Sequence, residues 1–293
     1  MLSILQFGAT GQVARELIRQ GPAAGAQIVA LSRADADLAH PEACVDAIAR
    51  AGAVDVVINA AAYTAVDQAE ADEATALRVN GDAPGAMARA CAARNIPLLH
   101  VSTDYVFDGS TSGAYGEDAP VNPLGAYGWT KLAGEQAVWA AGGPTVILRT
   151  SWVFSAFGKN FVKTMLRLAE QRNELGVVDD QHGGPTAAGD IADALLKVAR
   201  ACADGRGQWG IFHFSGAPVT TWRRFAEAIF ERALPPERRP RVRPIRTADY
   251  PTPAVRPANS ALDCRRIAAA YGIAQPSWES SLERVIEELQ IGG

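Results

Sequence analysis

The chain has 293 residues, 48% of them hydrophobic, and its 28 Lys and Arg residues against 32 Asp and Glu residues give a formal net charge of −4. This length can bury a sizeable core in one large or two modest domains, and the composition excludes a disordered chain. Basic and acidic residues are interspersed, so we expect no nucleic-acid partner. Asp, Arg or Gly interrupts every apolar stretch before the roughly 18 residues of a membrane span, so we expect no membrane partner.

The amino-terminal half alternates short apolar runs with helical patterns. Residues 2–7 form the first apolar run, and a helical pattern then begins at Gly11 with Val13, Leu17 and Ile18 on one face. Further strands are expected at 28–31, 55–59, 97–102 and 146–149, and further helices at 41–51, 72–94 and 127–140. Because short continuous strands alternate with helices, we predict an α/β fold with a doubly wound parallel sheet of the Rossmann type in residues 1–150.

Beyond residue 150 this rhythm weakens. Helical patterns occur at 159–172, 187–203, 221–233 and 279–290. Residues 234–257 contain too many prolines for a central strand or a helix and are expected to form loops. We therefore predict that residues 151–293 form mostly a smaller, discontinuous α/β substrate-binding lobe. Segments at approximately 176–200 are expected to return to the dinucleotide-binding domain.

The four cysteines give no sign of a structural site. Cys44, Cys91, Cys202 and Cys264 have neither the paired spacing of a zinc site nor the framework of a disulfide-rich domain. The first residues, Met1 to Phe7, enter a glycine turn directly and lack the segments of a signal peptide. The sequence therefore favours reduced thiols in a cytoplasmic protein.

A glycine turn joins the first predicted strand to the first predicted helix. It reads Gly-x-x-Gly-x-x-Ala, and its candidate cofactor-binding residues are Gly8, Thr10, Gly11, Gln12 and Val13. Glycines at such a turn let backbone amides and the positive helix terminus approach a pyrophosphate. A merely tight strand-to-helix turn is the alternative. The position of the turn within the alternating pattern favours dinucleotide binding.

The end of the second predicted strand carries Ser32 and Arg33. A fold that prefers NAD usually places an acidic residue there for the ribose hydroxyls, whereas an arginine can pair with a 2′-phosphate. NADPH is therefore favoured, although NADH use is possible if Arg33 is only a solvated side chain. Asp37 and Leu38 in the following loop are candidates to flank the adenine, and the alternative for Asp37 is a turn or helix-capping residue.

A tyrosine and a lysine, Tyr127 and Lys131, stand one helical turn apart, downstream of a strand that ends near Thr103. This spacing puts both side chains on one helix face. An unperturbed phenol titrates near ~10, and a neighbouring cation lowers that pKa. We therefore expect Tyr127 to act as an acid or a base. The isolated spacing is also compatible with a surface tyrosine beside a solvated lysine.

Five spaced motifs strengthen the catalytic interpretation. They are Asn59-Ala60-Ala61-Ala62-Tyr63-Thr64-Ala65-Val66-Asp67, Ser102-Thr103-Asp104-Tyr105-Val106-Phe107, Arg149-Thr150-Ser151-Trp152-Val153-Phe154, Asp180-Gln181-His182-Gly183-Gly184-Pro185-Thr186 and Arg256-Pro257-Ala258-Asn259-Ser260. In this order, and over nearly the whole chain, they resemble the dTDP-4-dehydrorhamnose reductase family of the extended short-chain dehydrogenase/reductases.

The resemblance implies site residues at matching positions. It implies catalytic roles for Thr103, Tyr127 and Lys131. It adds cofactor contacts at Ser32, Asp37, Leu38, Ala62, Tyr63 and Thr64, beside Gly11, Gln12, Val13, Tyr127 and Lys131. For the sugar nucleotide it points to Val66, Thr103, Asp104, Tyr105 and Trp152. Val66 and Trp152 have core or strand-end packing as their alternative role, and Asp104 has loop capping.

Some members of this family are described as homodimers bridged by magnesium through glutamates. Glu16 matches one of those positions, but Gly189 stands at the second, and the chain ends in Gly292-Gly293. Because a metal needs several oxygen ligands, magnesium is doubtful here, no metal ligand is assigned, and a homodimer stays possible.

The activity that the resemblance implies is NADPH-dependent reduction of the C4 ketone of dTDP-4-dehydro-L-rhamnose, with Tyr127 as the proton donor. Arg256 is our candidate for the substrate diphosphate, and a structural role in its loop is the alternative. Two other functions remain open. One is a sibling reductase or epimerase of another nucleotide-linked keto sugar. The other is a non-catalytic cofactor-binding regulatory subunit, which the retention of the catalytic trio disfavours.

Overall fold

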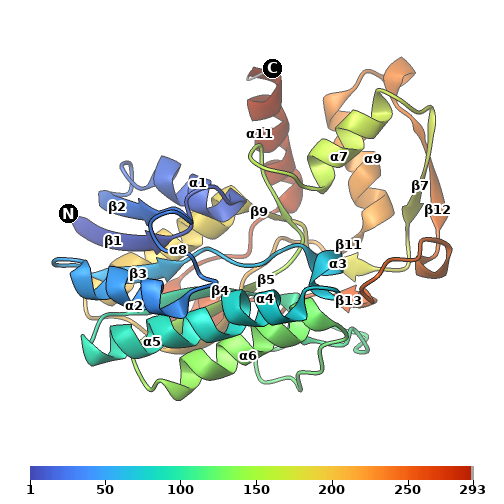
Figure 1. Ribbon diagram of the computed structural model, residues 1–293. Coiled ribbons are helices and arrows are strands. Elements are labelled where there is room, and N and C mark those ends of the chain that lie inside the picture. The colour runs from blue at the N-terminus through green and yellow to red at the C-terminus, as the bar shows by residue number, and fades with distance from the viewer. Residues whose placement is uncertain (292–293) are drawn as a thin grey trace.

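The computed structural model of the protein describes residues 1–291 and is organised around one large parallel sheet (Figure 1). Its six strands lie in the order β2 (Ala26–Leu31), β1 (Leu2–Phe7), β3 (Val56–Asn59), β4 (Leu98–Thr103), β5 (Thr145–Thr150) and β10 (Gly210–His213). All neighbouring strands in this sheet pair in parallel. The predicted doubly wound α/β fold is therefore confirmed.

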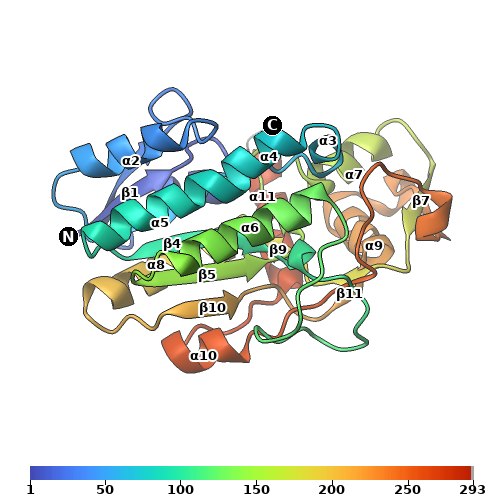
Figure 2. The same ribbon diagram turned by 60° about the horizontal axis from the view of Figure 1, so that its bottom comes forward.

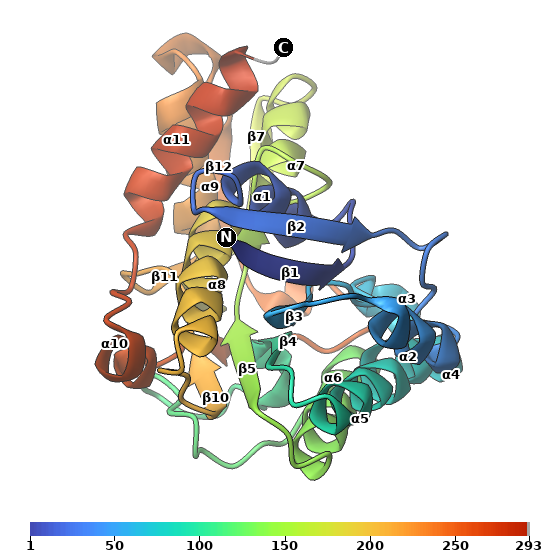
Figure 3. The same ribbon diagram turned by 90° about the vertical axis from the view of Figure 1, so that its left-hand side faces the viewer.

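Helices cover both faces of this sheet, as the view along it in Figure 3 shows. One face carries α1 (Gln12–Gln20), α8 (Ala188–Ala203) and α10 (Arg265–Tyr271), and the other carries α2 (Pro41–Arg50), α5 (Ala83–Ala93) and α6 (Ala126–Ala140). The inner strands are mainly apolar because both of their faces are buried; Val56, Val57 and Ile58 have no exposed surface. Two hydrophobic clusters, one on each face, hold the three layers together.

Two helices differ from their predicted form. On α1, Leu17 is fully buried, but Ile18 is 40% exposed. Ile18 lies one residue beyond Leu17, about 100° further around the helix, and so leaves the buried face. The helix predicted at 72–94 is interrupted: α4 (Glu73–Leu77) continues into a π-helical turn (Arg78–Asp82) and then into α5. A π-helical turn of this kind is frequent at functional sites.

A smaller lobe lies beside the carboxyl ends of the strands (Figure 1). Its helices are α7 (Phe161–Ala169), α9 (Trp222–Ala233) and α11 (Trp278–Ile291), and they pack around a cluster that includes Phe154, Phe225 and Leu282. Its short sheets are β7 (Glu174–Val178) with β12 (Arg241–Ile245), β6 (Val153–Phe154) with β9 (Thr186–Ala187), and β11 (Thr220–Thr221) with β8 (His182–Gly183) and β13 (Asn259–Ser260).

The segment expected to contain only loops, residues 234–257, includes strand β12, so that expectation is wrong in part. β12 pairs with β7 in a sheet of two strands, where both strands are edges. An edge strand has one side free of ladder hydrogen bonds, so it tolerates Pro244. The rest of the segment is irregular apart from two 3₁₀ turns, Pro236–Arg238 and Thr247–Asp249.

Two elements of the second half join the large sheet. Helix α8 packs against α1, and β10 extends the sheet beyond β5. Figure 2 shows β10 beside β5, with both strands below α6 in that view. The division of the chain at residue 150 and the return of residues 176–200 stay predictions, and Gly292 and Gly293 lie outside the described residues. Within the described part of the chain, no helix is both long and apolar enough to cross a membrane.

Candidate active site

The predicted site segments follow the carboxyl ends of parallel strands. The glycine turn follows β1, Ser32 follows β2, and residues 60–65 follow β3. The Thr103 motif ends β4, and Trp152 follows β5. Parallel strands place these ends at one edge of the sheet, and the chain order reverses between β1 and β3. In open α/β sheets the ligand crevice lies outside the strand ends at such a reversal point.

The glycine turn has the geometry of an anion site. Gly8 has φ +98°, and a side chain there would also crowd Ala60 and Ala61. Among the described residues no side chain caps the start of α1 at Gly11, and the first turn of α1 contains no acidic residue. The amides and positive terminus of α1 therefore fit a pyrophosphate.

A buried glutamine, Gln6, supports this turn from below. Its Nε2 donates to the Gly8 carbonyl at 2.7 Å and to the Ala14 carbonyl at 3.1 Å. Gln6 was not predicted as a site residue, although a polar side chain within a mainly apolar strand is a signal visible in the sequence. Gln12, a predicted cofactor contact, accepts from Asn160 Nδ2 at 3.0 Å and so links α1 to the lobe.

The loop after β2 is organised by its own carboxylates. Ser32 donates through its amide and its hydroxyl to Asp35, at 2.8 and 2.6 Å. Arg33 is 81% exposed and pairs with Asp37 at 2.9 Å. Asp37 also accepts a hydrogen bond from the Ala39 amide, as expected for its alternative role as a turn-capping residue. This bond holds the pKa of Asp37 below its usual value. Leu38 is buried in the cluster beneath the loop.

The loop after β3 is fixed by Asn80, which belongs to the π-helical turn. Asn80 Oδ1 accepts from the Tyr63 amide at 2.8 Å, and its Nδ2 donates to the Tyr63 carbonyl at 3.1 Å. Asn80 Nδ2 also lies 3.2 Å from the Thr130 hydroxyl on α6. Ala62 is half-buried and Thr64 is exposed. Asn80 was not predicted as a site residue because it lies within residues 72–94, which were expected to form one regular helix.

Close packing places Tyr127 beside Thr103. Thr103 is 5% exposed, and the next residues form a 3₁₀ turn (Asp104–Val106). A side chain on Gly128 would lie 2.3 Å from the Tyr105 carbonyl oxygen, so only glycine lets α6 approach this turn. The Tyr127 ring then meets the Tyr105 ring edge to face, with centroids 5.4 Å apart.

The electrostatics at Tyr127 correct one expectation. Burial raises the pKa of Tyr127 to about 12, Thr103 offsets part of that rise, and Asp104 adds to it. Lys131 is not a cause of the shift, so the expected lowering of the Tyr127 pKa by Lys131 is wrong for this structure. The physical reason is that loss of water around the phenol outweighs nearby charge. Tyr127 is consequently a neutral phenol at neutral pH, the form that can donate a proton.

Lys131 lies under the site with 1% of its surface exposed. Its Nζ donates to the Val101 carbonyl at 2.8 Å and lies 3.4 Å from His100 Nε2. Burial lowers the pKa of Lys131 to about 8, while Glu135 acts in the opposite direction. Burial and Lys131 together hold the pKa of His100 well below its usual value, so His100 is neutral.

An ion pair behind Lys131 was also missed. Glu135 and Arg149 are each 3% exposed at the side chain, and the shortest of their contacts is 2.6 Å. Ser102 donates to the same carboxylate at 2.5 Å. The sequence could have indicated this ion pair, because Ser102 and Arg149 are polar residues in segments predicted to be buried strands. These bonds tie α6 to β4 and β5.

Two predicted sugar-site residues are unusual: Asp104 in its raised pKa and Trp152 in its backbone conformation. Asp104 is 3% exposed, accepts from the Thr103 hydroxyl at 3.1 Å, and has a pKa raised by burial to about 6. Trp152 has φ +49°, in the left-handed region that a bulky side chain rarely adopts. Its indole stacks on Trp222, with centroids 3.6 Å apart, and a side chain on Gly183 would clash with it.

Arg256 reaches the site edge but has an internal partner. It donates to Asp67 at 2.8 Å, while Asp67 also accepts from the Ala254 amide. Asp67 belongs to α3 (Val66–Ala69), so this ion pair joins the lobe to the helix that begins with half-buried Val66. The diphosphate role of Arg256 stays a prediction.

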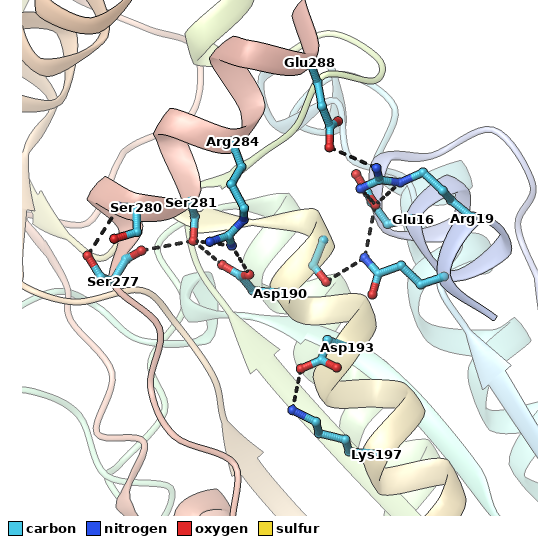
Figure 4. A network of polar contacts seen from close by, with 12 residues as sticks. Glu16, Arg19, Asp190, Asp193, Lys197, Ser277, Ser280, Ser281, Arg284 and Glu288 are labelled. Carbon is cyan, nitrogen blue, oxygen red and sulfur yellow. Dashed lines mark hydrogen bonds and ion pairs between the residues drawn. The ribbon is translucent and has the colours of Figure 1, made fainter. Parts of the chain in front are cut away.

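The described residues do not fit a magnesium ion at Glu16. Figure 4 shows the seam formed by α1, α8 and α11, where Arg19 lies between Glu16 and Glu288. Gln20 donates to Glu16 as well, and Arg284 pairs with Asp190 at 2.6 Å. Guanidinium groups therefore take the place of a cation. Nowhere within residues 1–291 do three or more His, Cys, Asp or Glu side chains gather in a group that could hold a metal.

Comparison with known proteins places the chain in a family. A protein-family model for the RmlD substrate binding domain matches residues 2–291. The dTDP-4-dehydrorhamnose reductase of Burkholderia thailandensis is 46% identical over 98% of this chain and 99% of its own length. That of Aggregatibacter actinomycetemcomitans is 44% identical over 97% and 98%.

Solved structures agree with these sequence matches. A dTDP-4-dehydrorhamnose reductase from Clostridium acetobutylicum has a TM-score of 0.92 and 35% identity, covering 99% of this chain and 100% of the other. One from Bacillus anthracis, in complex with NADP, has a TM-score of 0.90 and 32% identity, covering 98% and 100%. The chain therefore belongs to the RmlD substrate binding domain family, among the dTDP-4-dehydrorhamnose reductases.

Proposed function

We propose that this protein reduces the C4 ketone of dTDP-4-dehydro-L-rhamnose to give dTDP-L-rhamnose, with Tyr127 as the proton donor. NADPH, when bound, supplies the hydride. The observation that carries the proposal is a half-buried tyrosine, Tyr127, whose phenol is held beside the Thr103 hydroxyl at the strand ends, with Lys131 one helical turn further on. Full-length similarity to named dTDP-4-dehydrorhamnose reductases supports the choice of substrate.

The three side chains have separate tasks. Tyr127 holds its proton until negative charge develops on the ketone oxygen, because its pKa is raised to about 12. Thr103 donates a hydrogen bond to that oxygen and orients it. Lys131 presents a buried positive charge, held in place by the Val101 carbonyl, toward the cofactor side of the site.

The amides at the start of α1 receive the pyrophosphate, and Arg33 favours a 2′-phosphate, so NADPH is the preferred cofactor. The substrate is a small nucleotide sugar, and Arg256 offers a positive charge to its diphosphate. A cytoplasmic location agrees with the four free thiols of Cys44, Cys91, Cys202 and Cys264. Arg19 occupies the seam at Glu16, so a homodimer of this chain needs an interface other than a magnesium bridge there.

The test is NADPH oxidation, followed by absorbance, with enzymatically prepared dTDP-4-dehydro-L-rhamnose. Tyr127→Phe should lower kcat by about 100- to 10000-fold, the usual worth of a general acid, while NADPH binding is retained. Tyr271→Phe is the matched control, because the Tyr271 hydroxyl contacts Gln208 far from the strand ends. NADH should support a much lower rate than NADPH. Arg33→Ala should reduce the difference between the rates with the two cofactors.

Each outcome has a separate meaning. If the Tyr127→Phe variant turns over at a nearly normal rate, Tyr127 is not the proton donor, but the assignment of the protein as a reductase stands. NADPH binding without oxidation of this substrate shifts the assignment to another nucleotide-linked keto sugar. If no nucleotide-linked keto sugar supports NADPH oxidation, the remaining function is that of a non-catalytic, cofactor-binding regulatory subunit.

A further inference from the structure

One buried carboxyl oxygen beside the catalytic threonine has no partner. Asp104 Oδ1 accepts from the Thr103 hydroxyl at 3.1 Å. Asp104 Oδ2 is fully enclosed, and no donor among residues 1–291 makes a well-formed hydrogen bond to it, although the Ser260 side chain is close enough to offset part of the rise that burial causes in the pKa of Asp104. Most buried polar atoms are paired, so an unpaired oxygen of this kind calls for a physical reason. A carboxyl oxygen that carries a proton is one such reason, because a neutral acid can itself donate.

The Thr103 hydroxyl makes two hydrogen bonds in the structure, and it also lies close enough to the Tyr127 hydroxyl to offset part of the rise that burial causes in the pKa of Tyr127. A hydroxyl has one hydrogen to donate and two lone pairs to accept with. One lone pair takes the Tyr105 amide at 3.2 Å, and the single hydrogen goes to Asp104. While Asp104 is a carboxylate, which only accepts, Thr103 has no hydrogen left for the ketone oxygen of a substrate.

Protonation of Asp104 reverses this bond. A carboxylic acid donates to the second lone pair of Thr103, and the Thr103 hydrogen becomes free for the ketone oxygen. In this arrangement Thr103 accepts from the Tyr105 amide and from Asp104, and its one hydrogen is available to the ketone oxygen beside Tyr127. We propose that Asp104 is a positioning residue that acts in its neutral form and turns the Thr103 hydroxyl toward the ketone. This inference rests on the proposed reductase function.

The surroundings of Asp104 support a neutral acid. Its pKa is raised by burial to about 6, and the Ser260 and Thr103 side chains offset only part of the rise. The titratable groups around it are Tyr105 on the same turn and Tyr127 on α6, both neutral phenols at neutral pH. The Arg256–Asp67 ion pair acts on Tyr105, one residue beyond Asp104.

This proposal predicts an acid-favoured reduction. With a pKa of about 6, about one Asp104 in ten carries a proton at pH 7, and nearly all do at pH 5. The value of kcat/KM should therefore fall by up to tenfold per pH unit above pH 6, because kcat/KM reports groups of the free enzyme. By pH 8 the fall should approach about 100-fold, which is within the usual worth of one donor to a developing oxyanion, about 100- to 1000-fold.

The experiment compares pH profiles of kcat/KM from pH 5 to pH 8 for four forms: wild type, Asp104→Asn, Thr103→Val and the double variant. An asparagine amide can donate to Thr103 at every pH, so Asp104→Asn should have a flat profile up to about pH 7, above which Lys131, with a pKa of about 8, begins to lose its charge in every variant. Without the Thr103 hydroxyl, adding Asp104→Asn should change nothing further, as a residue that acts through Thr103 requires. Asp193→Asn, an exposed carboxylate on α8, is the matched control and should keep the wild-type slope.

A second readout does not need activity. Carbon-13 NMR of labelled aspartate should show one carboxyl that titrates near pH 6 in wild type and is missing in Asp104→Asn. A titration near pH 4, or a pH slope below about pH 7 that survives in Asp104→Asn, overturns the proposal. If wild type reduces no keto sugar at any pH, the reductase function fails, and the NMR titration still decides the protonation of Asp104.

Discussion

Two polar clusters where the lobe meets the large sheet differ in how completely their side chains are paired. In the seam of α1, α8 and α11, each carboxylate faces a guanidinium: Glu16 and Glu288 share Arg19, and Asp190 pairs with Arg284 (Figure 4). At the strand ends, Asp104 is buried with an oxygen that makes no well-formed hydrogen bond to any residue within 1–291.

The difference indicates which cluster serves structure and which serves chemistry. A paired cluster holds elements together and offers little to a ligand. An incompletely paired buried cluster costs stability, and that cost is expected where groups are kept ready for a substrate. The causes of the pKa shifts follow the same division. Burial sets the pKa shifts of Tyr127, Lys131 and Asp104 at the strand ends. In the seam, by contrast, burial opposes the charge on Arg19, and its two glutamate partners outweigh that effect and raise the pKa of Arg19.

The largest effect should come from breaking the paired, buried Glu135–Arg149 contact. Glu135→Gln leaves the Arg149 charge enclosed without a carboxylate and should lower the free energy of unfolding by about 3–5 kcal/mol. Chemical denaturation measures this. The exposed pair Lys197–Asp193 is the control, and Lys197→Ala should change stability by less than about 0.5 kcal/mol. Equal effects for the two variants would contradict the structural role of the buried pair.

A second effect tests the strand-end cluster through Thr103. Thr103→Val removes the donor to the ketone oxygen and should lower kcat by about 100- to 1000-fold, whereas Thr103→Ser should keep most activity. Steady-state kinetics at saturating NADPH give both values. Thermal unfolding checks that the valine is accommodated, since Thr103 is buried. Activity of the valine variant at the wild-type level would remove Thr103 from the site.

A third effect is the pH dependence of stability at Asp104. The pKa is about 6 in the folded protein against about 3.9 unfolded, so the folded state binds this proton more tightly. The stabilisation is therefore full below pH 3.9 and is lost as pH rises through 6. Relative to Asp104→Asn, wild type should lose about 2–3 kcal/mol between pH 4 and pH 7 in urea unfolding. If the difference in unfolding free energy between wild type and Asp104→Asn does not change with pH, Asp104 has the same pKa in the folded and unfolded protein.

The smallest effect concerns the seam. Arg19→Met should lower stability by about 1 kcal/mol or less, because Arg19 is 47% exposed and solvent screens its pairs. EDTA should change neither the wild-type melting temperature nor its oligomeric state in size-exclusion chromatography. If Glu16 and Glu288 bind a cation once Arg19 is removed, magnesium should raise the melting temperature of Arg19→Met more than that of wild type. A melting temperature of wild type that falls with EDTA would contradict the replacement of a metal by arginine.

Much of the fold follows from local patterns. The strands and helices of the first 150 residues were predictable because periods of apolar residues report burial directly. Strand β12 was not, because its pairing with β7 decides whether a proline-containing segment can be a strand. The π-helical turn was missed for a similar reason: Asn80 is placed by its bonds to the loop at Tyr63, seventeen positions away.

The sequence by itself determined the α/β alternation, the glycine turn and the placing of Tyr127 and Lys131 on one helix face, since each depends on neighbours within a few residues. Only the tertiary structure decided how these groups titrate and pair. The pKa of Tyr127 rises because distant segments exclude water from it, and Arg256 meets Asp67 across 189 positions of sequence. Burial and charge pairing are properties of the assembled fold, so local patterns cannot supply them.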